Sequence, residues 1–301
     1  MEYRTLGRTG LKVSTLGFGA LEIGRNWPYW RQDRDDFSRP DESRSIALLH
    51  EAMDKGVNFF DTAPAYQHSE EILGKAFKGM RKDVVIGTKC GEWFDGKNSI
   101  YDYSYAETKK FIDNSLRLLQ TDYIDLLQIH SANADVIRSG ETLRAMKEAQ
   151  QAGKTRFIGL STDDVETALL SIHSGEYDTI QVSYNAINLK FGRDVFPDAQ
   201  KHNIGVIVKD GMARGKLSGK FKDVTDKSEY GIIAEINELA KKYSMELSDL
   251  ALRFCMSNPT VASVIIGTKK REHFLANLSA AQRGKLPDEL HTALMEMNTN
   301  V

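Results

Sequence analysis

Cysteine is scarce in this chain: Cys90 and Cys255 are the only two among 301 residues. They lie far apart and form no CxxC pair, which argues against a disulfide framework and against a zinc site. Both are expected to be small buried residues in a protein of a reducing compartment. No metal site is predicted.

Long apolar runs and an excess of one charge are also missing. No run approaches the roughly 18 apolar residues of a membrane span, and residues 1–4 are charged with no apolar stretch behind them. The formal net charge is −2 at pH 7, which argues against nucleic acid and anionic membrane as partners. These features predict neither a signal peptide nor an anchor, and a cytoplasmic location.

The chain does contain a repeated alternation of short apolar runs and helical patterns. Residues 3–13, with a glycine-containing turn, predict an N-terminal β-hairpin. Uninterrupted apolar runs are typical of strands buried on both faces. Eight such runs follow, at residues 16–19, 57–60, 84–87, 124–129, 157–160, 179–182, 205–208 and 261–266. Ser69, before two glutamates, is expected to cap a helix.

Eight strands that alternate with helices predict a parallel sheet closed into a barrel. The predicted fold class is therefore α/β, a (β/α)8 TIM barrel with an N-terminal β-hairpin, in one domain over residues 1–301. An open doubly wound sheet is the alternative, but Gly17, Gly19 and Gly24 miss the G-x-G-x-x-G spacing of its dinucleotide-binding form. Residues 208–261 are interpreted as a long loop with helices around 232–243 and 247–257.

Four side chains with complementary chemistry fall at the ends of three successive predicted strands. Asp61 and Tyr66 follow the run at 57–60, Lys89 ends the next, and His130 follows 124–129. The carboxyl ends of the strands form the working face of a parallel barrel, so we expect all four side chains in one mouth.

This combination predicts proton donation without a metal. A free tyrosine has a pKa near ~10, and a nearby ammonium such as that of Lys89 lowers it. A buried Lys89 needs a carboxylate, the expected role of Asp61, and His130 can donate a hydrogen bond to a carbonyl oxygen. A cofactor must supply the hydride, since no side chain does. Taken singly, each residue could equally be a helix cap or a solvated group.

The chain resembles the aldo-keto reductase family from Leu6 to about Asn277. The resemblance rests on residues 59–66 (FFDTAPAY) with 69–74 after them, 88–89 (TK) and 128–130 (QIH). It implies a catalytic tetrad with Tyr66 as proton donor, Lys89 and Asp61 tuning it, and His130 orienting the substrate.

The resemblance also implies an NADPH site. Ser161 and Gln181 correspond to residues that hold the nicotinamide carboxamide, whereas Thr162 stands where the family has Asn. Lys209 replaces a flat side chain and could pack its stem on the ring or meet a phosphate. A structural network would explain Gln181 equally well. The predicted cofactor-binding set is Gly19, Ala20, Leu21, Ser161, Thr162, Gln181, Lys209, Gly211, Met212, Arg214, Gly215, Lys220, Gly267, Lys269, Lys270, Arg271, His273 and Asn277.

Cations after the last predicted strand favour the 2′-phosphate of NADPH as a ligand. Lys269, Lys270 and Arg271 open a helix, and a helix N-terminus with adjacent cations is an anion site. Arg271 or Lys270 is the expected main partner. Cations oppose the helix dipole there and would cost stability without an anion. Gly211 and Gly215 fit a loop that approaches the pyrophosphate.

We therefore predict NADPH-dependent reduction of a small-molecule aldehyde or ketone, with the oligomeric state left open. Loop aromatics are expected to line the substrate pocket or to form a core lid; they are Trp27, Tyr29, Trp30, Trp93 and Phe94. One alternative is a non-catalytic NADPH-binding redox sensor that reports to a partner protein. The other is a hydrolase or aldolase that forms a Schiff base on Lys89, which Asp61 would oppose by keeping that lysine protonated.

Overall fold

The chain forms a closed barrel of eight parallel strands that follow one another in chain order. The computed structural model describes residues 1–25, 40–218 and 227–297. The last barrel strand pairs with the first in parallel, which closes the ring. The barrel strands are β3 (Leu16–Gly19), β4 (Phe59–Asp61), β5 (Val85–Cys90), β8 (Ile124–Ile129), β9 (Thr155–Ser161), β10 (Thr179–Ser183), β11 (Gly205–Lys209) and β12 (Val261–Gly267). The predicted fold class is confirmed.

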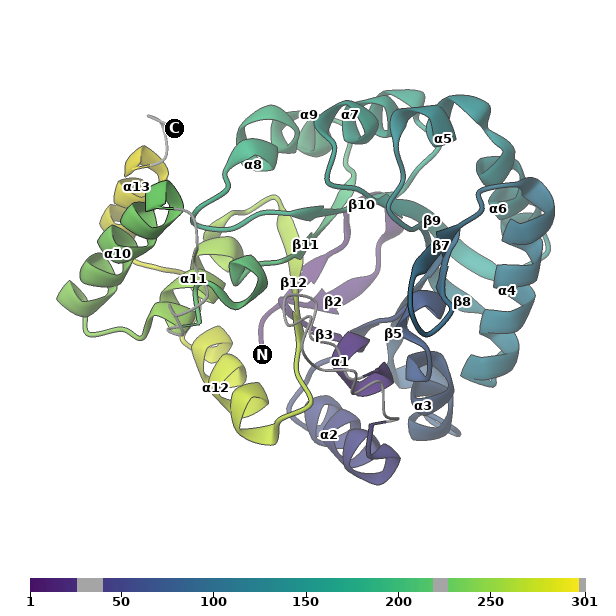
Figure 1. The fold of residues 1–301 in the computed structure, drawn as a ribbon, viewed down its shortest axis with the longest axis horizontal. Coiled ribbons are helices and arrows are strands. Elements are labelled where there is room, and N and C mark those ends of the chain that lie inside the picture. Colours follow the sequence, from purple (N-terminus) through teal and green to yellow (C-terminus); the bar gives the residue numbers. More distant parts are fainter. Residues whose placement is uncertain (26–39, 219–226, 298–301) are drawn as a thin grey trace.

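Helices surround the strands and cover their outer faces (Figure 1). The α-helices are α1 (Leu21–Gly24), α2 (Glu42–Asp54), α3 (Ser69–Ala76), α4 (Tyr105–Leu119), α5 (Ala134–Ser139), α6 (Glu141–Gln151), α7 (Val165–Ser174), α8 (Lys190–Asp194), α9 (Phe196–Lys201), α10 (Lys227–Lys242), α11 (Leu247–Ser257), α12 (Arg271–Gln282) and α13 (Asp288–Met297). Short 3-10 helices are η1 (Gly7–Thr9), η2 (Pro64–Tyr66), η3 (Arg81–Asp83) and η4 (Ala213–Gly215). Within the described ranges, no helix has the length and apolar character needed to cross a bilayer.

The barrel strands are buried on both faces, as their continuous apolar runs predict. Every residue of β4, β5, β8 and β10 is buried. Apolar side chains on one face pack against the helices, and those on the other fill the barrel interior. A polar side chain in such a strand must therefore find its partners inside the barrel.

The predicted N-terminal hairpin closes the amino end of the barrel. Its strands β1 (Tyr3–Thr5) and β2 (Lys12–Ser14) pair antiparallel. Leu6, Leu11 and Val13 are buried in one cluster with side chains of the barrel strands. This hairpin does not cover the opposite, carboxyl end of the barrel, where an active site is expected.

A second hairpin stands at the carboxyl end of β5 and was not predicted. It consists of β6 (Glu92–Phe94) and β7 (Ser99–Tyr101), which pair antiparallel. Gly91 joins it to β5 with a φ of +93°, in the region that favours glycine. This sharp turn brings Glu92 back over the mouth of the barrel.

The prediction that Ser69 caps a helix is wrong. The residue before α3 is His68, which makes no capping bond, and Ser69 is the first helical residue. The hydroxyl of Ser69 lies 2.6 Å from that of Thr62. It therefore ties α3 to the loop after β4 instead of satisfying the helix terminus.

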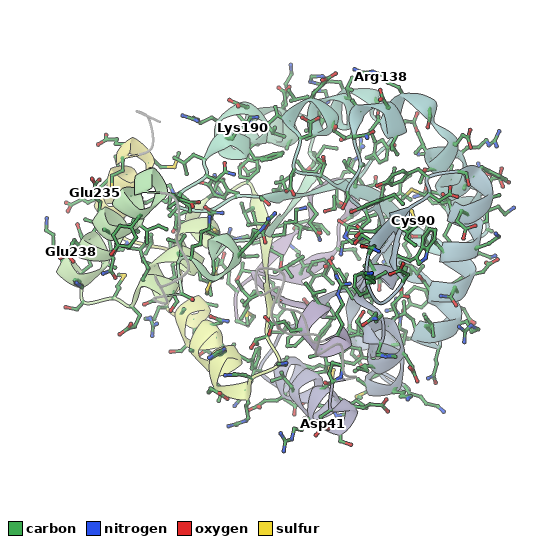
Figure 2. All side chains as sticks on the ribbon, in the orientation of Figure 1. Asp41, Cys90, Arg138, Lys190, Glu235 and Glu238 are labelled. Atoms are coloured by element: carbon green, nitrogen blue, oxygen red, sulfur yellow. The ribbon has the colours of Figure 1, made fainter. Side chains whose placement is uncertain are left out.

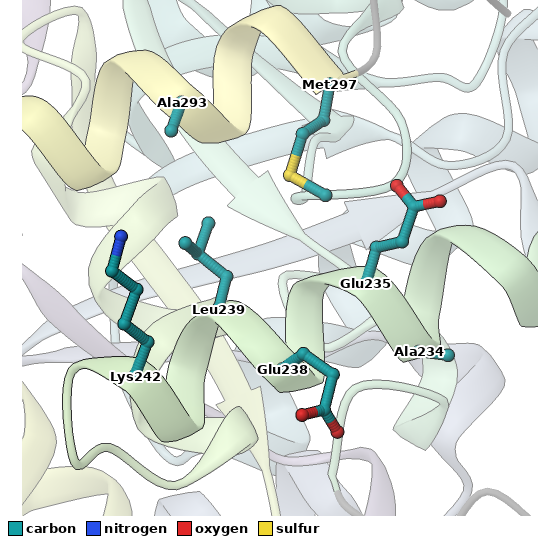
Figure 3. Close-up of a pocket in the computed structure, with 7 residues that line it drawn as sticks. All are labelled: Ala234, Glu235, Glu238, Leu239, Lys242, Ala293 and Met297. Carbon is teal, nitrogen blue, oxygen red and sulfur yellow. The ribbon is translucent and has the colours of Figure 1, made fainter.

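The segment between β11 and β12 carries two helices, as predicted, although α10 begins earlier, at Lys227. A groove of about 560 Å³ lies between α10 and α13, and its lining residues are drawn in Figure 3. It is lined by Ala234, Glu235, Glu238, Leu239, Lys242, Ala293 and Met297. None of these lining residues belongs to the predicted site.

Candidate active site

The structure brings the four predicted catalytic side chains together at the carboxyl end of the barrel. Asp61 ends β4, Lys89 lies on β5 and His130 directly follows β8, and these three strands are neighbours. Lys89 Nζ is 4.9 Å from the ring centroid of Tyr66. The rings of Tyr66 and His130 meet edge to face, with centroids 5.7 Å apart.

Lys89 and Asp61 form a buried ion pair. Lys89 Nζ donates to Asp61 Oδ2 at 2.7 Å and to the carbonyl oxygen of Thr62 at 2.9 Å. Neither Lys89 nor Asp61 is more than 3% exposed. A buried ion pair persists only when its partners also satisfy the remaining polar atoms. Cys90, the residue after Lys89, is also buried; its side chain is labelled in Figure 2.

Two glutamine side chains complete the surroundings of Asp61. Gln181 Nε2 donates to Asp61 Oδ1 at 2.7 Å, and Gln128 Nε2 reaches the same oxygen at 3.4 Å. The structural network considered for Gln181 therefore exists. It satisfies one carboxylate oxygen while the other accepts from Lys89 Nζ, and this engagement of the amino group disfavours a Schiff base on that lysine.

The position of Tyr66 depends on a glycine. Gly24 ends α1, and its carbonyl accepts a hydrogen bond from the amide of His68 at 3.3 Å. A Cβ on Gly24 would fall inside van der Waals distance of the Tyr66 carbonyl oxygen and of Ser69. Only a residue without a side chain lets η2 sit against α1 here.

We expect Gly24→Ala to lower both stability and turnover. Overpacking of a buried site costs about 1–3 kcal/mol, and relief of the clash would move Tyr66. Gly231→Ala is the matched control, because Gly231 has nothing within 4 Å of an added Cβ and alanine is the better helix former. Thermal unfolding and steady-state rates of both variants test this; an unaltered rate in Gly24→Ala would contradict it.

The pKa of Tyr66 is raised in this structure, whereas the ammonium of Lys89 was expected to lower it. Burial raises that pKa well above its usual value, and Asp61 and Glu92 raise it further, whereas Arg25 opposes them. Asp61, which is among the groups that raise this pKa, is the ion-pair partner of Lys89 at 2.7 Å. The phenol therefore stays protonated, which suits a proton donor in its resting state.

His130 is a neutral imidazole in contact with a carboxylate. Burial, followed by Lys89, Lys209 and Arg25, lowers its pKa well below the usual range. Its Nδ1 lies 3.1 Å from Glu92 Oε2, although the atoms are not aligned as a hydrogen bond. Glu92 was not predicted as a site residue, because a single acidic residue between a glycine and a tryptophan matches no motif that indicates a functional site.

The aromatic residues expected around the substrate divide into two groups. Trp27, Tyr29 and Trp30 lie outside the described residues. Trp93 packs on Phe111 of α4, with centroids 5.8 Å apart. The guanidinium of Arg25 lies 4.1 Å above the ring of Phe94. Arg25 is itself buried, which lowers its pKa to about 10 against the opposing effects of Tyr66 and Glu92.

The residues predicted to contact the carboxamide lie on β9, directly after it and on β10. Their side chains differ in whether they already have hydrogen-bond partners within the protein. Ser161 Oγ is buried and makes no hydrogen bond within the described structure. Thr162 Oγ1 donates to the Ala132 carbonyl at 2.8 Å and accepts from the Asp164 amide. The hydroxyl of Thr162 is thus part of the loop structure, and only Ser161 presents an unsatisfied group that a bound amide would fit.

Lys209 and the loop after β11 form a charged cluster. Lys209 Nζ lies 3.2 Å from Asp163 Oδ1. Asp210, Ala213 and Arg214 all have positive φ, between +47° and +55°, and Arg214 Nε reaches Asp210 at 3.3 Å. Residues in this conformation turn successive amides to one side, as anion-binding loops do. Gly211, Met212 and Gly215 belong to the same loop, and Lys220 lies outside the described residues.

The predicted 2′-phosphate cations already face carboxylates of the chain. Arg271 Nε and Nη2 pair with the two oxygens of Glu51, on α2, at 2.7 and 2.6 Å. Glu22 Oε2 accepts from the Lys269 amide at 3.2 Å. The protein itself therefore supplies two carboxylates beside these cations, so Arg271 and Lys269 do not require an outside anion.

The other predicted cofactor positions surround this corner. Gly19 pairs with both Asp61 and Gly267 in the barrel register, and the Ala20 amide donates to the Asp61 carbonyl at 2.8 Å. Leu21 opens α1. Lys270 precedes α12, and His273 and Asn277 lie on it. Gly19, Ala20, Leu21 and Lys270 lie at or just after the carboxyl ends of β3 and β12, and the other two residues lie farther along the chain in α12.

A closed parallel barrel with an ion pair, a tyrosine and a histidine at its carboxyl end defines a (β/α)8 enzyme. The sequence model of the Aldo/keto reductase family matches residues 15–299. This chain belongs to that family, and it is an oxidoreductase.

Similar proteins cover nearly the whole chain. L-galactose dehydrogenase of Arabidopsis thaliana is 32% identical over 93% of this chain and 88% of its own length. A probable voltage-gated potassium channel subunit beta of the same plant is 29% identical over 93% and 91%. The structure of the aldo-keto reductase AKR11C1 from Bacillus halodurans, in a holo form, superposes with a TM-score of 0.85 at 29% identity, covering 100% of this chain and 97% of that one.

Proposed function

We propose that this protein reduces an aldehyde or ketone with NADPH, with Tyr66 as the proton donor. The buried Lys89–Asp61 pair beside the protonated Tyr66 carries the proposal. Such a pair is costly in a core, and its place at the carboxyl end of a barrel is where enzymes of this fold act.

Each residue has a defined task at the carbonyl. NADPH supplies the hydride when it is bound. Tyr66 gives its proton to the carbonyl oxygen as negative charge develops there, and Lys89 stabilises the phenolate that remains. Asp61 pairs with Lys89 and holds it in one position, and His130 orients the carbonyl.

The binding of a nicotinamide cofactor is supported by one buried hydroxyl and by the loop after β11. Ser161 Oγ is the buried polar atom that the carboxamide would satisfy. The positive-φ residues at Asp210, Ala213 and Arg214 suit the pyrophosphate. Lys209 would meet a phosphate or the ring once it turns from Asp163.

The preference for NADPH over NADH is expected to depend on Arg271. Arg271 is the expected partner of the 2′-phosphate, but one edge of its guanidinium pairs with Glu51. A carboxylate at this distance repels a phosphate dianion that approaches the same guanidinium. Glu51 should therefore weaken the preference for NADPH.

Replacement of Glu51 should strengthen that preference. We expect Glu51→Gln to raise NADPH affinity about two- to fivefold, the scale of one exposed ion pair, and to leave NADH affinity unchanged. Calorimetric titration of both cofactors at two salt concentrations measures this, with Glu238→Gln on α10 as the control. If the ratio of the two affinities stays fixed, Arg271 does not bind the 2′-phosphate.

A second function has support from one group of relatives. Two plant proteins named as probable voltage-gated potassium channel beta subunits are 28–29% identical to this chain. They favour the redox sensor, in which a bound cofactor reports to a partner protein. L-galactose dehydrogenase, at 32% identity, favours catalysis on a sugar-like substrate.

A single-turnover experiment separates the two functions. The protein is loaded with NADPH, mixed with a panel of aldehydes, ketones and aldoses, and followed by the absorbance of the reduced nicotinamide. Loss of that absorbance with at least one carbonyl compound is expected. If bound NADPH persists with every compound, the reductase proposal fails and the sensor stands.

A further inference from the structure

Tyr103 is a half-buried phenol beside the mouth of the barrel, and the proposed reaction gives it no role. It lies two residues after the end of β7, where the second hairpin leads into α4. Its hydroxyl lies 2.8 Å from the carbonyl oxygen of His130 and 3.1 Å from that of Ser131. One phenol therefore serves two successive carbonyl groups in the turn directly after β8.

This turn needs support from outside because its backbone is strained. Ser131 has a φ of +51°, in the left-handed region that residues other than glycine rarely occupy. Such a conformation persists only where the surrounding structure holds it. The amide of His130 donates to the Cys90 carbonyl at 2.8 Å, so the neighbouring strand fixes one side of this residue. The phenol of Tyr103 fixes the other side, at the carbonyl.

Tyr103 is itself held in place by its neighbours. Thr142 of α6 donates its hydroxyl hydrogen to the Tyr103 carbonyl at 2.5 Å. The amide of Asp102 donates to the Gly91 carbonyl at 3.1 Å. A Cβ on Gly91 would fall 2.5 Å from two ring carbons of Tyr103, so the ring packs directly on the glycine backbone. Burial, followed by Glu92, raises the pKa of the phenol, and the hydroxyl therefore keeps the proton that it donates.

We propose that Tyr103 is a positioning residue for His130: its hydroxyl holds the turn after β8, and through that turn it holds the imidazole at the mouth of the barrel. The expected effect on rate rests on the proposed reductase function, whereas the expected effect on the imidazole does not. The rings of His130 and Tyr66 meet edge to face, so a shift of the turn would change the place of one relative to the other. A displacement of about 1 Å caused by a distant substitution can lower a rate about 10²-fold.

Tyr103→Phe removes the hydroxyl and keeps the ring that packs on Gly91. We expect kcat for carbonyl reduction to fall about 10- to 100-fold, while the affinity for NADPH stays within about twofold of the wild-type value. Tyr177→Phe is the matched control. Tyr177 lies before β10 and is buried, and its hydroxyl makes no hydrogen bond within the described residues. This control should keep the wild-type kcat.

Ser131→Gly separates positioning of the turn from a general loss of packing. Glycine adopts a positive φ about as readily as a negative one, so the turn would no longer depend on the phenol. In a Ser131→Gly background, Tyr103→Phe should therefore lower kcat by only about threefold or less. An equal loss in both backgrounds would overturn the proposal, and so would a wild-type kcat in Tyr103→Phe alone.

Nitrogen-15 spectra of the imidazole test the proposal without substrate or cofactor. We expect one sharp set of His130 ring signals in the wild type and in Tyr177→Phe, and broadened or doubled signals in Tyr103→Phe. Signals in Tyr103→Phe that match those of the wild type would overturn the proposal. If the signals change as expected but the wild type reduces no carbonyl compound, the reductase function fails and the positioning of His130 by Tyr103 stands.

Discussion

Tyr66→Phe is expected to lower kcat for carbonyl reduction by about 10²–10⁴-fold, the usual contribution of a positioned general acid. The hydroxyl is the only atom removed, and the ring keeps its edge contact with His130. Because the phenol is protonated in the resting structure, the loss should be present over the whole physiological pH range. Affinity for NADPH should change little.

Stopped-flow rates of hydride transfer and a cofactor titration measure the two quantities separately. Tyr105→Phe is the matched control, since Tyr105 is a surface residue of α4 whose hydroxyl bonds Glu148. It should react at the wild-type rate. Full activity in Tyr66→Phe would show that another group, such as a water molecule held by His130, donates the proton.

The barrel could be predicted because its strands are buried on both faces. An uninterrupted apolar run is required there, and eight such runs separated by helical patterns leave few other arrangements. The short hairpin of β6 and β7 has no such constraint: its residues are half-exposed or exposed apart from Glu92. The sequence pattern therefore does not distinguish it from a loop.

The proximity of Asp61, Lys89 and His130 could be predicted for the same topological reason. Residues at the carboxyl ends of neighbouring parallel strands must converge. Gln181 was recognisable as a polar residue in an apolar strand, and Gln128 carries the same pattern on β8. Their shared partner, Asp61, follows only from the three-dimensional register.

Contacts between distant loops and helices could not be predicted. The pairing of Arg271 with Glu51 joins residues 220 positions apart, on surfaces whose composition permits many partners. The raised pKa of Tyr66 was not predicted, because the ammonium of Lys89 was considered without the burial of the phenol and without the carboxylates of Asp61 and Glu92, which raise that pKa. Electrostatic effects depend on the whole set of neighbouring charges, and that set is a property of the fold.

Replacement of Lys89 or Asp61 alone should lower the free energy of unfolding by more than replacement of both residues together. Asp61→Asn leaves the Lys89 ammonium with the Thr62 carbonyl as its remaining hydrogen-bond partner, and Lys89→Met leaves a carboxylate held only by two amides. Loss of one partner of a buried pair costs about 3–5 kcal/mol. Both single variants should therefore unfold at markedly lower denaturant concentrations, and neither should reduce a carbonyl compound.

The double variant Asp61→Asn/Lys89→Met removes both charges and should recover part of the lost stability, with a coupling energy of about 0.5–3 kcal/mol. Denaturant unfolding of all four proteins gives this value directly. The surface pair of Lys154 and Asp113, at 2.6 Å with both side chains over 40% exposed, is the control and should cost about 0–1 kcal/mol when either partner is replaced. If the buried and surface pairs gave similar losses, Lys89 and Asp61 would not be charged in the folded protein. Tyr66 would then lack the cation that stabilises its phenolate after proton transfer, and the catalytic assignment would have to be abandoned.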